Sequence, residues 1–216
     1  MSRPLQNRVD PFGVIHAVAA RGAWMGNRGG CLHNERRELT RRRWVSKRWI
    51  ACVLVFKERR RTVMTPRRYT ELFFLDEATA LAAGHRPCFE CRREAAQAFA
   101  AAWGRAADCP QPPSADEMDR VLHGERRLSR GSQFDSPVVR PADLPNGVMV
   151  AIPSQDGGQS AWLVRDGALY PWSFTGYGEC RSAVDVPEAE LITPPSMVAA
   201  IQAGYPVHLS LPAPAS

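Results

Sequence analysis

Cys88 and Cys91 are separated by two residues within the segment 84–93, which also contains Arg86, Arg92 and Arg93. Two thiols at this spacing can bind one tetrahedral metal ion from a tight turn, as in structural zinc modules. Binding is coupled to deprotonation of the thiols, and nearby arginines help to stabilise the thiolates. The segment therefore predicts a structural Zn2+ site. The alternative is a pair of reduced thiols without an ion.

A tetrahedral site needs two further ligands from elsewhere in the chain. Cys52 lies in a β-rich run, 49–56, where alternation places it on the same face as Ile50 and Leu54. It is therefore either a ligand or a small core residue. Cys31 and His33 point the same way from an extended segment and can both reach one ion. For His33, a solvent-facing imidazole is the alternative.

The elements around these cysteines follow from local signals. Strands are predicted over 49–56 and 70–75, and a short helix over 77–83, with Asp76 as its N-cap and Gly84 as its stop. Pro87 prevents this helix from resuming, so the chain turns where the two thiols lie. A longer helix is expected from Cys91 to about Trp103, which places Cys91 at a helix start.

Residues 69–93 combine the aromatic pair Phe73-Phe74, a short alanine-rich helix ending in Ala-Gly, and Arg-Pro-Cys-x-x-Cys. This order resembles the Ada-type zinc-binding domain of bacterial alkylation-repair regulators. The resemblance implies zinc held by cysteines, contact with the DNA backbone, and a zinc-bound thiolate that accepts a methyl group. Only the second ligand pair carries over, onto Cys88 and Cys91, with Arg86 facing phosphate. The first pair, to which methyl acceptance belongs, would fall at 57–61, where this sequence has no cysteine.

The charge is divided unevenly along the chain. Residues 1–105 contain 21 of the 28 Lys and Arg and 9 of the 22 Asp and Glu, so their net charge is 21 − 9 = +12; the remainder carries 7 − 13 = −6. Clustered positive charge favours a nucleic-acid partner, and the Ada-type resemblance implies DNA rather than RNA. A solvated basic surface is the alternative. The predicted phosphate contacts flank the strand and the cysteine turn: Arg67, Arg68, Arg86, Arg92 and Arg93.

Catalysis on nucleic acid is the alternative to nucleic-acid binding alone. A metal-dependent nuclease needs a base to activate water and acids to hold Mg2+ or Mn2+. His33, Glu35 and Glu71 lie in the basic half and are the candidates for those roles. Acids near arginines also form ion pairs or helix caps, which is the structural alternative.

The overall prediction is an α+β protein with a basic, Ada-like zinc-binding region over 1–107 and a proline-rich linker over 108–114. An acidic region over 115–216 contains a small antiparallel meander. The acidic region either packs against the basic one or binds a protein partner. The chain shows no apolar run near the roughly 18 residues that span a membrane. Its N-terminus lacks the apolar core of a secretion signal, and its cysteine usage fits reduced thiols, so a cytoplasmic location is expected.

Overall fold

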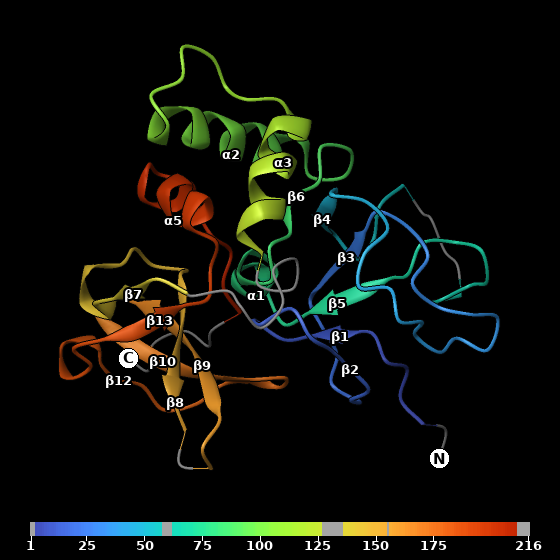
Figure 1. Cartoon of the computed structure of the whole chain (residues 1–216), viewed down its shortest axis with the longest axis horizontal. Coiled ribbons are helices and arrows are strands. Elements are labelled where there is room, and N and C mark those ends of the chain that lie inside the picture. Colours follow the sequence, from blue (N-terminus) through green and yellow to red (C-terminus); the bar gives the residue numbers. More distant parts are fainter. Residues whose placement is uncertain (1–2, 58–61, 127–135, 155, 211–216) are drawn as a thin grey trace.

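The computed structural model describes residues 3–57, 62–126, 136–154 and 156–210. Two β-sheets lie toward opposite ends of the long axis, with helix α1 between them and the other helices above it (Figure 1). Helices and sheets together confirm the predicted α+β class. Most of the segment 57–61, where the first ligand pair of the resemblance would fall, lies outside the described residues.

The first sheet has the strand order β2-β1-β5-β3-β4-β6 within the described part of the chain. Strand β3 pairs antiparallel with β4 and β5, whereas β6 runs parallel to β4, with Ile50 opposite Arg86. Both predicted strands are present but shorter than expected, because pairing along β4 ends at Cys52. The strand bounds are β1 Arg8–Val9, β2 Ile15–His16, β3 Trp24–Arg28, β4 Trp49–Cys52, β5 Leu72–Phe74 and β6 Arg86–Pro87.

The second sheet contains the predicted antiparallel meander. Its strand order is β11-β10-β9-β8-β13-β7 among the described residues, and β12 pairs with β10. Two of its aromatic side chains reach helix α1: Trp172 Nε1 donates to Thr79 Oγ1 at 3.0 Å, and the Tyr177 hydroxyl donates to Asp76 Oδ2 at 2.8 Å. The strand bounds are β7 Val138–Val139, β8 Met149–Pro153, β9 Gln159–Arg165, β10 Ala168–Ser173, β11 Gly176–Tyr177, β12 Arg181–Ser182 and β13 Ala189–Leu191.

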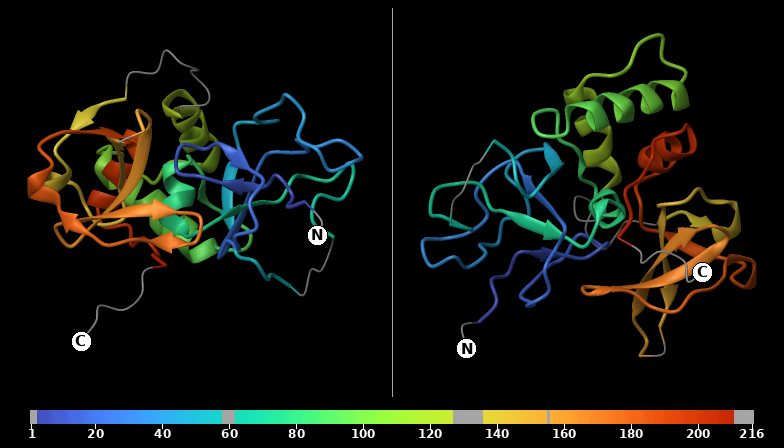
Figure 2. Two further views of the ribbon diagram at one scale, coloured as in Figure 1. Left: turned by 90° about the horizontal axis from the view of Figure 1, so that it is seen from below. Right: turned by 180° about the vertical axis from the view of Figure 1, so that it is seen from behind.

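Helix α1 (Glu77–Ala82) joins the two sheets, as the two views of Figure 2 also show. Ala80, together with Ala83 at the C-cap, packs into the apolar cluster of the first sheet. Ala78 and Ala82 pack into a cluster with residues of the second sheet. Because alanine is small, both sheets can approach the helix axis closely, which explains the alanine-rich sequence.

The ends of this helix follow the predicted signals. The Asp76 side chain accepts a hydrogen bond from Thr79 N at 2.9 Å, and Gly84 adopts φ +81°, which ends the helix. The prediction that Cys91 begins the next helix is wrong. Helix α2 runs over Arg93–Ala106, because residues 88–91 form a turn closed by Arg92 N donating to the Cys88 carbonyl at 3.0 Å.

The largest buried cluster joins helices α2, α3 (Ala115–Glu125) and α5 (Pro195–Gln202) to the second sheet. Phe99 of α2, Met118 of α3 and Ile201 of α5 belong to this one cluster. The predicted linker 108–114 is a loop without helix or strand, but it connects two helices that share a core. The structure therefore does not separate two packing units at 108–114.

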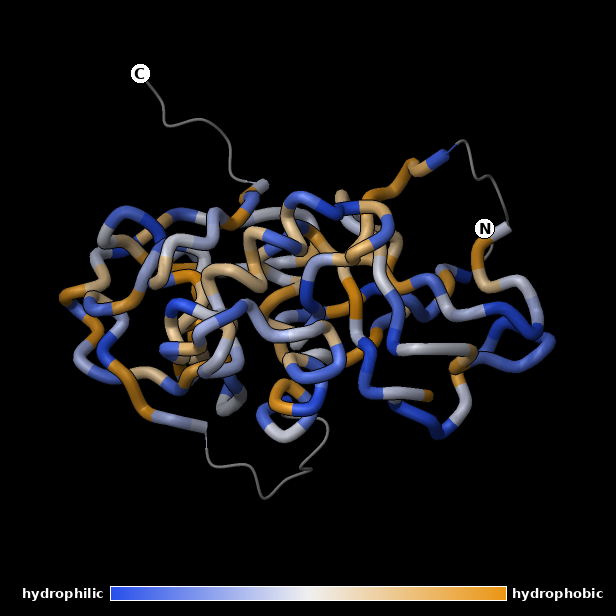
Figure 3. Tube along the Cα trace, turned by 90° about the horizontal axis from the view of Figure 1, so that it is seen from above, coloured by the Kyte–Doolittle hydropathy of each residue, from blue (hydrophilic) through white to orange (hydrophobic). Residues whose placement is uncertain are grey.

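Figure 3 shows hydrophilic colouring over most of the loops at the end of the molecule opposite the second sheet. These loops connect the strands of the first sheet, and the described part of them carries a cluster of exposed basic residues. Within the described ranges, every helix is too short or too polar to cross a membrane.

Candidate metal centre

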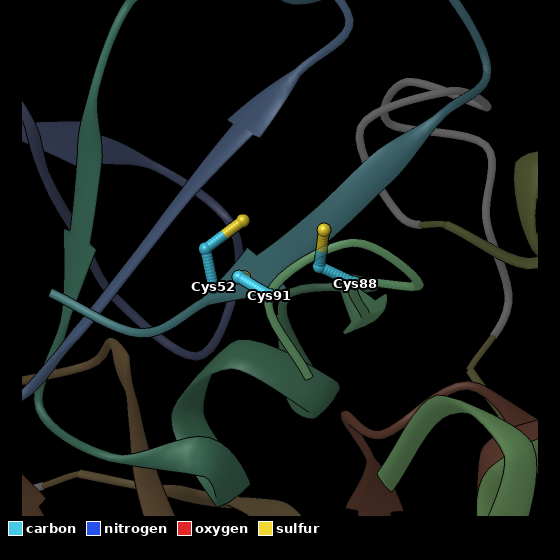
Figure 4. Close-up of side chains that lie close together, drawn as sticks. All are labelled: Cys52, Cys88 and Cys91. Carbon is cyan, nitrogen blue, oxygen red and sulfur yellow. The ribbon is translucent and has the colours of Figure 1, made fainter. Parts of the chain in front are cut away.

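The first sheet brings Cys52 beside the cysteine turn. Cys52 is the last residue of β4, and β6 leads directly into Cys88. Because β4 and β6 are parallel neighbours, Cys88 N can donate to the Ala51 carbonyl, at 3.0 Å. Figure 4 shows the sulfur atoms of Cys52 and Cys88 on the same side of the strand, with Cys91 between them in the turn.

The three thiol sulfurs lie within 4.8 Å of one another. Cys52 and Cys88 are buried, each 6% exposed, and Cys91 is half-buried. All three are free thiols. Three sulfur ligands at this separation, on a strand end and a turn held by backbone hydrogen bonds, can hold one metal ion. The structure thus brings together three of the five predicted ligands.

The electrostatics of the cluster favour a thiolate at Cys88. Hydrogen bonding from the Cys52 thiol, and then from Cys91, holds the pKa of Cys88 well below its usual range, despite burial. The backbone amide of Glu90 also donates to the Cys88 sulfur at 3.4 Å. The pKa of Cys52 is raised, chiefly by its hydrogen bond to Cys88. A cation bound among the three would replace the protons that Cys52 and Cys88 otherwise share.

Cys31 and His33 lie together elsewhere. The Cys31 sulfur is 3.7 Å from His33 Nδ1, and neither residue belongs to the cluster of three cysteines. The His33 ring is buried and binds Thr70 Oγ1 at 2.7 Å and the Thr65 carbonyl at 3.2 Å. These contacts explain why His33 does not face solvent: it fixes the loop before β4 to the segment before β5.

Two of the five predicted phosphate contacts are buried. Arg86 forms a bidentate pair with Asp119 of α3, with Nη2 to Oδ2 at 2.6 Å and Nε to Oδ1 at 3.1 Å. Arg92 pairs with Glu77 of α1 at 2.7 Å, and its guanidinium stacks over Trp24. Both guanidinium groups are thus occupied inside the protein. This corrects the expectation that Arg86 and Arg92 present their charge to a polyanion.

The other three, Arg67, Arg68 and Arg93, are exposed. Arg67 lies close to Glu35 at 3.4 Å, in a solvent-exposed pair. Two loops beside β4, 29–48 and 53–71, carry further exposed cations. We call the following set of exposed residues the basic surface: Arg36, Arg37, Arg41, Arg42, Arg43, Lys47, Arg48, Arg67 and Arg68.

The candidate nuclease residues do not converge. His33 and Glu35 line one shallow pocket with Arg41 and Arg67, whereas Glu71 lines a different cavity beside the cysteines. Glu71 is buried and accepts a hydrogen bond from Met64 N at 2.8 Å. Among the described residues, the three cysteines form the only group of three or more His, Cys, Asp or Glu side chains close enough to share an ion.

The acidic region packs in part against the basic one. Besides the Arg86 pair, Asp116 of α3 lies 3.2 Å from Arg48. The acidic N-terminal part of α3 thus faces the part of the first sheet that carries the cysteines.

A cavity of about 370 Å3 lies beside the three cysteines. Alternation along the predicted 49–56 run correctly placed Ile50 and Cys52 on one face, and both line this cavity. Leu54 lines it too, but so does Val53, because β4 ends at Cys52 and alternation does not extend beyond it. The sequence did not indicate Met25 and Glu71 as further lining residues, because their proximity depends on pairing between strands distant in sequence.

Comparisons with protein-family models, with curated proteins and with solved structures found no match.

Proposed function

We propose that this chain is a zinc-containing protein of the cytoplasm that binds nucleic acid, DNA in the first place. The ion is held by Cys52, Cys88 and Cys91 and is structural. The basic surface contacts the phosphate backbone. The observation that carries the proposal is that both loops of the basic surface begin or end at β4, the strand that also supplies Cys52.

The donor set supports zinc. Thiolates are soft ligands, and Zn2+ is the common ion of tetrahedral sites rich in cysteine. Structural zinc of this kind contributes about 10–16 kcal/mol of binding free energy in small peptides at neutral pH. The described cysteines are all free, which fits a reducing compartment. The resemblance of residues 69–93 to Ada-type domains also supports both the metal and a DNA partner.

Charge supports the nucleic-acid partner. The basic surface gathers nine exposed guanidinium or ammonium groups on loops of the first sheet. Non-specific affinity for DNA rises with the number of phosphates that such groups neutralise, because each contact releases condensed counterions. The described loops contain few exposed acids that oppose this charge, Glu35 and Glu38 among them.

The test is a binding isotherm of the zinc-loaded protein with labelled double-stranded DNA at several salt concentrations. Replacing Arg67 and Arg68 by Ala should weaken binding and reduce the slope of log K against log salt by about 1.8, at about 0.9 per lost phosphate contact. The matched control replaces two exposed arginines of the second half, Arg120 and Arg140, and should leave the slope unchanged. An unaltered slope in both double variants would contradict the proposed interface.

The same isotherms should be repeated with single-stranded DNA and RNA, and with Mg2+ or Mn2+ present. Tighter binding of RNA than of DNA would correct the choice of nucleic acid. Cleavage that needs the divalent ion would favour the nuclease alternative. Transfer of a methyl mass to a cysteine would instead favour an alkyl acceptor.

A further inference from the structure

The cysteine cluster supplies three ligands, and it forms part of a cavity wall. Cys52, Cys88 and Cys91 all line the cavity of about 370 Å3. Within the described residues, no imidazole, carboxylate or further thiol lies within 4.8 Å of all three sulfurs. A tetrahedral ion with three protein ligands keeps one position for an exogenous ligand.

The cavity has the size and lining of a small-molecule site. Pockets for small ligands have volumes of roughly 300–1,000 Å3 and are mostly apolar with a few polar groups. Here the walls are formed largely by apolar side chains, including Met25, Ile50, Leu54 and Phe73. Met25 lies directly opposite Cys52 in the register of β3 and β4, so its side chain borders the thiol.

The polar lining indicates the charge of the ligand. Two acidic residues, Glu71 and Glu90, are among those that line the cavity, and three thiolates would surround the ion. None of the described lining residues is Lys or Arg. This lining opposes an anion, although the protein surface nearby is basic. A phosphate group is therefore a poor occupant of the cavity.

We propose that the metal centre is open on its cavity side and takes its fourth ligand from a neutral or cationic small molecule bound there. The molecule has an apolar body and an imidazole-type nitrogen or a thiol as its donor. This inference rests on the metal of the proposed function but not on nucleic-acid binding.

The test uses the full chain with Co2+ in place of Zn2+, because the visible absorption of thiolate-bound Co2+ reports its coordination. Titration with imidazole should change the spectrum saturably, whereas azide, a smaller ligand with a nitrogen donor and a negative charge, should have little effect. The variant Met25→Trp fills the cavity beside Cys52 and should weaken the apparent imidazole affinity by about tenfold or more. Met25→Leu keeps the volume and should respond as the unaltered protein does.

The outcomes separate the two proposals. Co2+ that binds but ignores imidazole overturns the open site; if Glu71→Gln or Glu90→Gln then alters the spectrum, a carboxylate closes the centre. An equal response of Met25→Trp and Met25→Leu shows that imidazole does not enter by the cavity, which also overturns the inference. Failure to bind Co2+ and Zn2+ at all removes both the inference and the metal of the proposed function. Binding of imidazole without any affinity for DNA supports the inference and removes the nucleic-acid proposal alone.

Discussion

Replacement of Asp119 by Ala should be among the most damaging single changes in this protein, although Asp119 lies far in sequence from the cysteines. Its side chain is 3% exposed and binds Arg86, itself 5% exposed, through two hydrogen bonds of 2.6 and 3.1 Å. The Arg126 guanidinium lies 3.8 Å away and is also buried. Asp119 is thus the carboxylate that two buried cations share.

The magnitude follows from what the substitution leaves behind. Removing one partner of a buried ion pair costs about 3–5 kcal/mol, because the remaining charge stays desolvated and unpaired. Domains of ordinary stability have a free energy of unfolding of about 5–15 kcal/mol, so the loss would be about a fifth or more of the total. Since Arg86 lies on β6, two residues before Cys88, the same change should loosen the cysteine turn and weaken metal binding.

Urea unfolding of the zinc-loaded protein, followed by tryptophan fluorescence, measures the loss. Asp116→Ala is the matched control on the same helix: its pair with Arg48 is exposed on both sides and should contribute less than about 1 kcal/mol. The double variant Arg86→Met, Asp119→Leu should recover part of the stability, because it removes both charges together. A loss below about 1 kcal/mol for Asp119→Ala would refute the reasoning from buried charge.

Three further outcomes are expected. Arg28→Lys should destabilise the fold by about 2–4 kcal/mol in urea unfolding. The fully buried guanidinium donates to His85 and to the Gly13 carbonyl and stacks 4.1 Å over Trp49. An ammonium group cannot reproduce these contacts of a planar group. Tyr205→Phe should cost about 1–2 kcal/mol in the same assay, since its hydroxyl donates to buried Glu77 Oε1 at 2.6 Å; an equal loss on replacing Tyr170 by Phe would contradict this. Acidification should release zinc, because protons compete with the ion for the thiolates, and a chromogenic chelator measures the release. A Cys52→Ser variant should bind zinc more weakly at every pH.

Local signals predicted the neighbourhood of the centre well. The cap at Asp76, the stop at Gly84 and the turn after Pro87 depend on residues close together in sequence, and each is present. The face of β4 that carries Cys52 also followed from alternation alone. The choice of Cys52 over Cys31 as a ligand did not, because it depends on the parallel pairing of β4 with β6, which brings together residues far apart in the chain.

Charge was harder to interpret than hydrophobic pattern. Arg86 and Arg92 are indistinguishable from Arg93 in a list of basic residues, but their acidic partners, Asp119 and Glu77, come from two different helices. An arginine can be buried when a carboxylate matches its planar fork, and such a match becomes visible only once the helices are placed.

The cysteine turn lies between Arg86 and Arg92, and this arrangement separates the proposed metal binding from the proposed nucleic-acid binding in physical terms. Arg86 fixes the start of the turn to α3, and Arg92 fixes its end to α1, so both act on the positions of the thiols. Arg67 acts through a charge exposed to solvent. Replacing Arg92 by Leu should therefore weaken zinc binding with the salt dependence of DNA binding unchanged in the zinc-saturated protein, whereas replacing Arg67 should do the reverse. An Arg92→Leu variant that lowered the salt slope as much as the loss of Arg67 would contradict this reasoning. The Arg92 guanidinium would then have to reach phosphate, and its buried ion pair with Glu77 would not be present in solution.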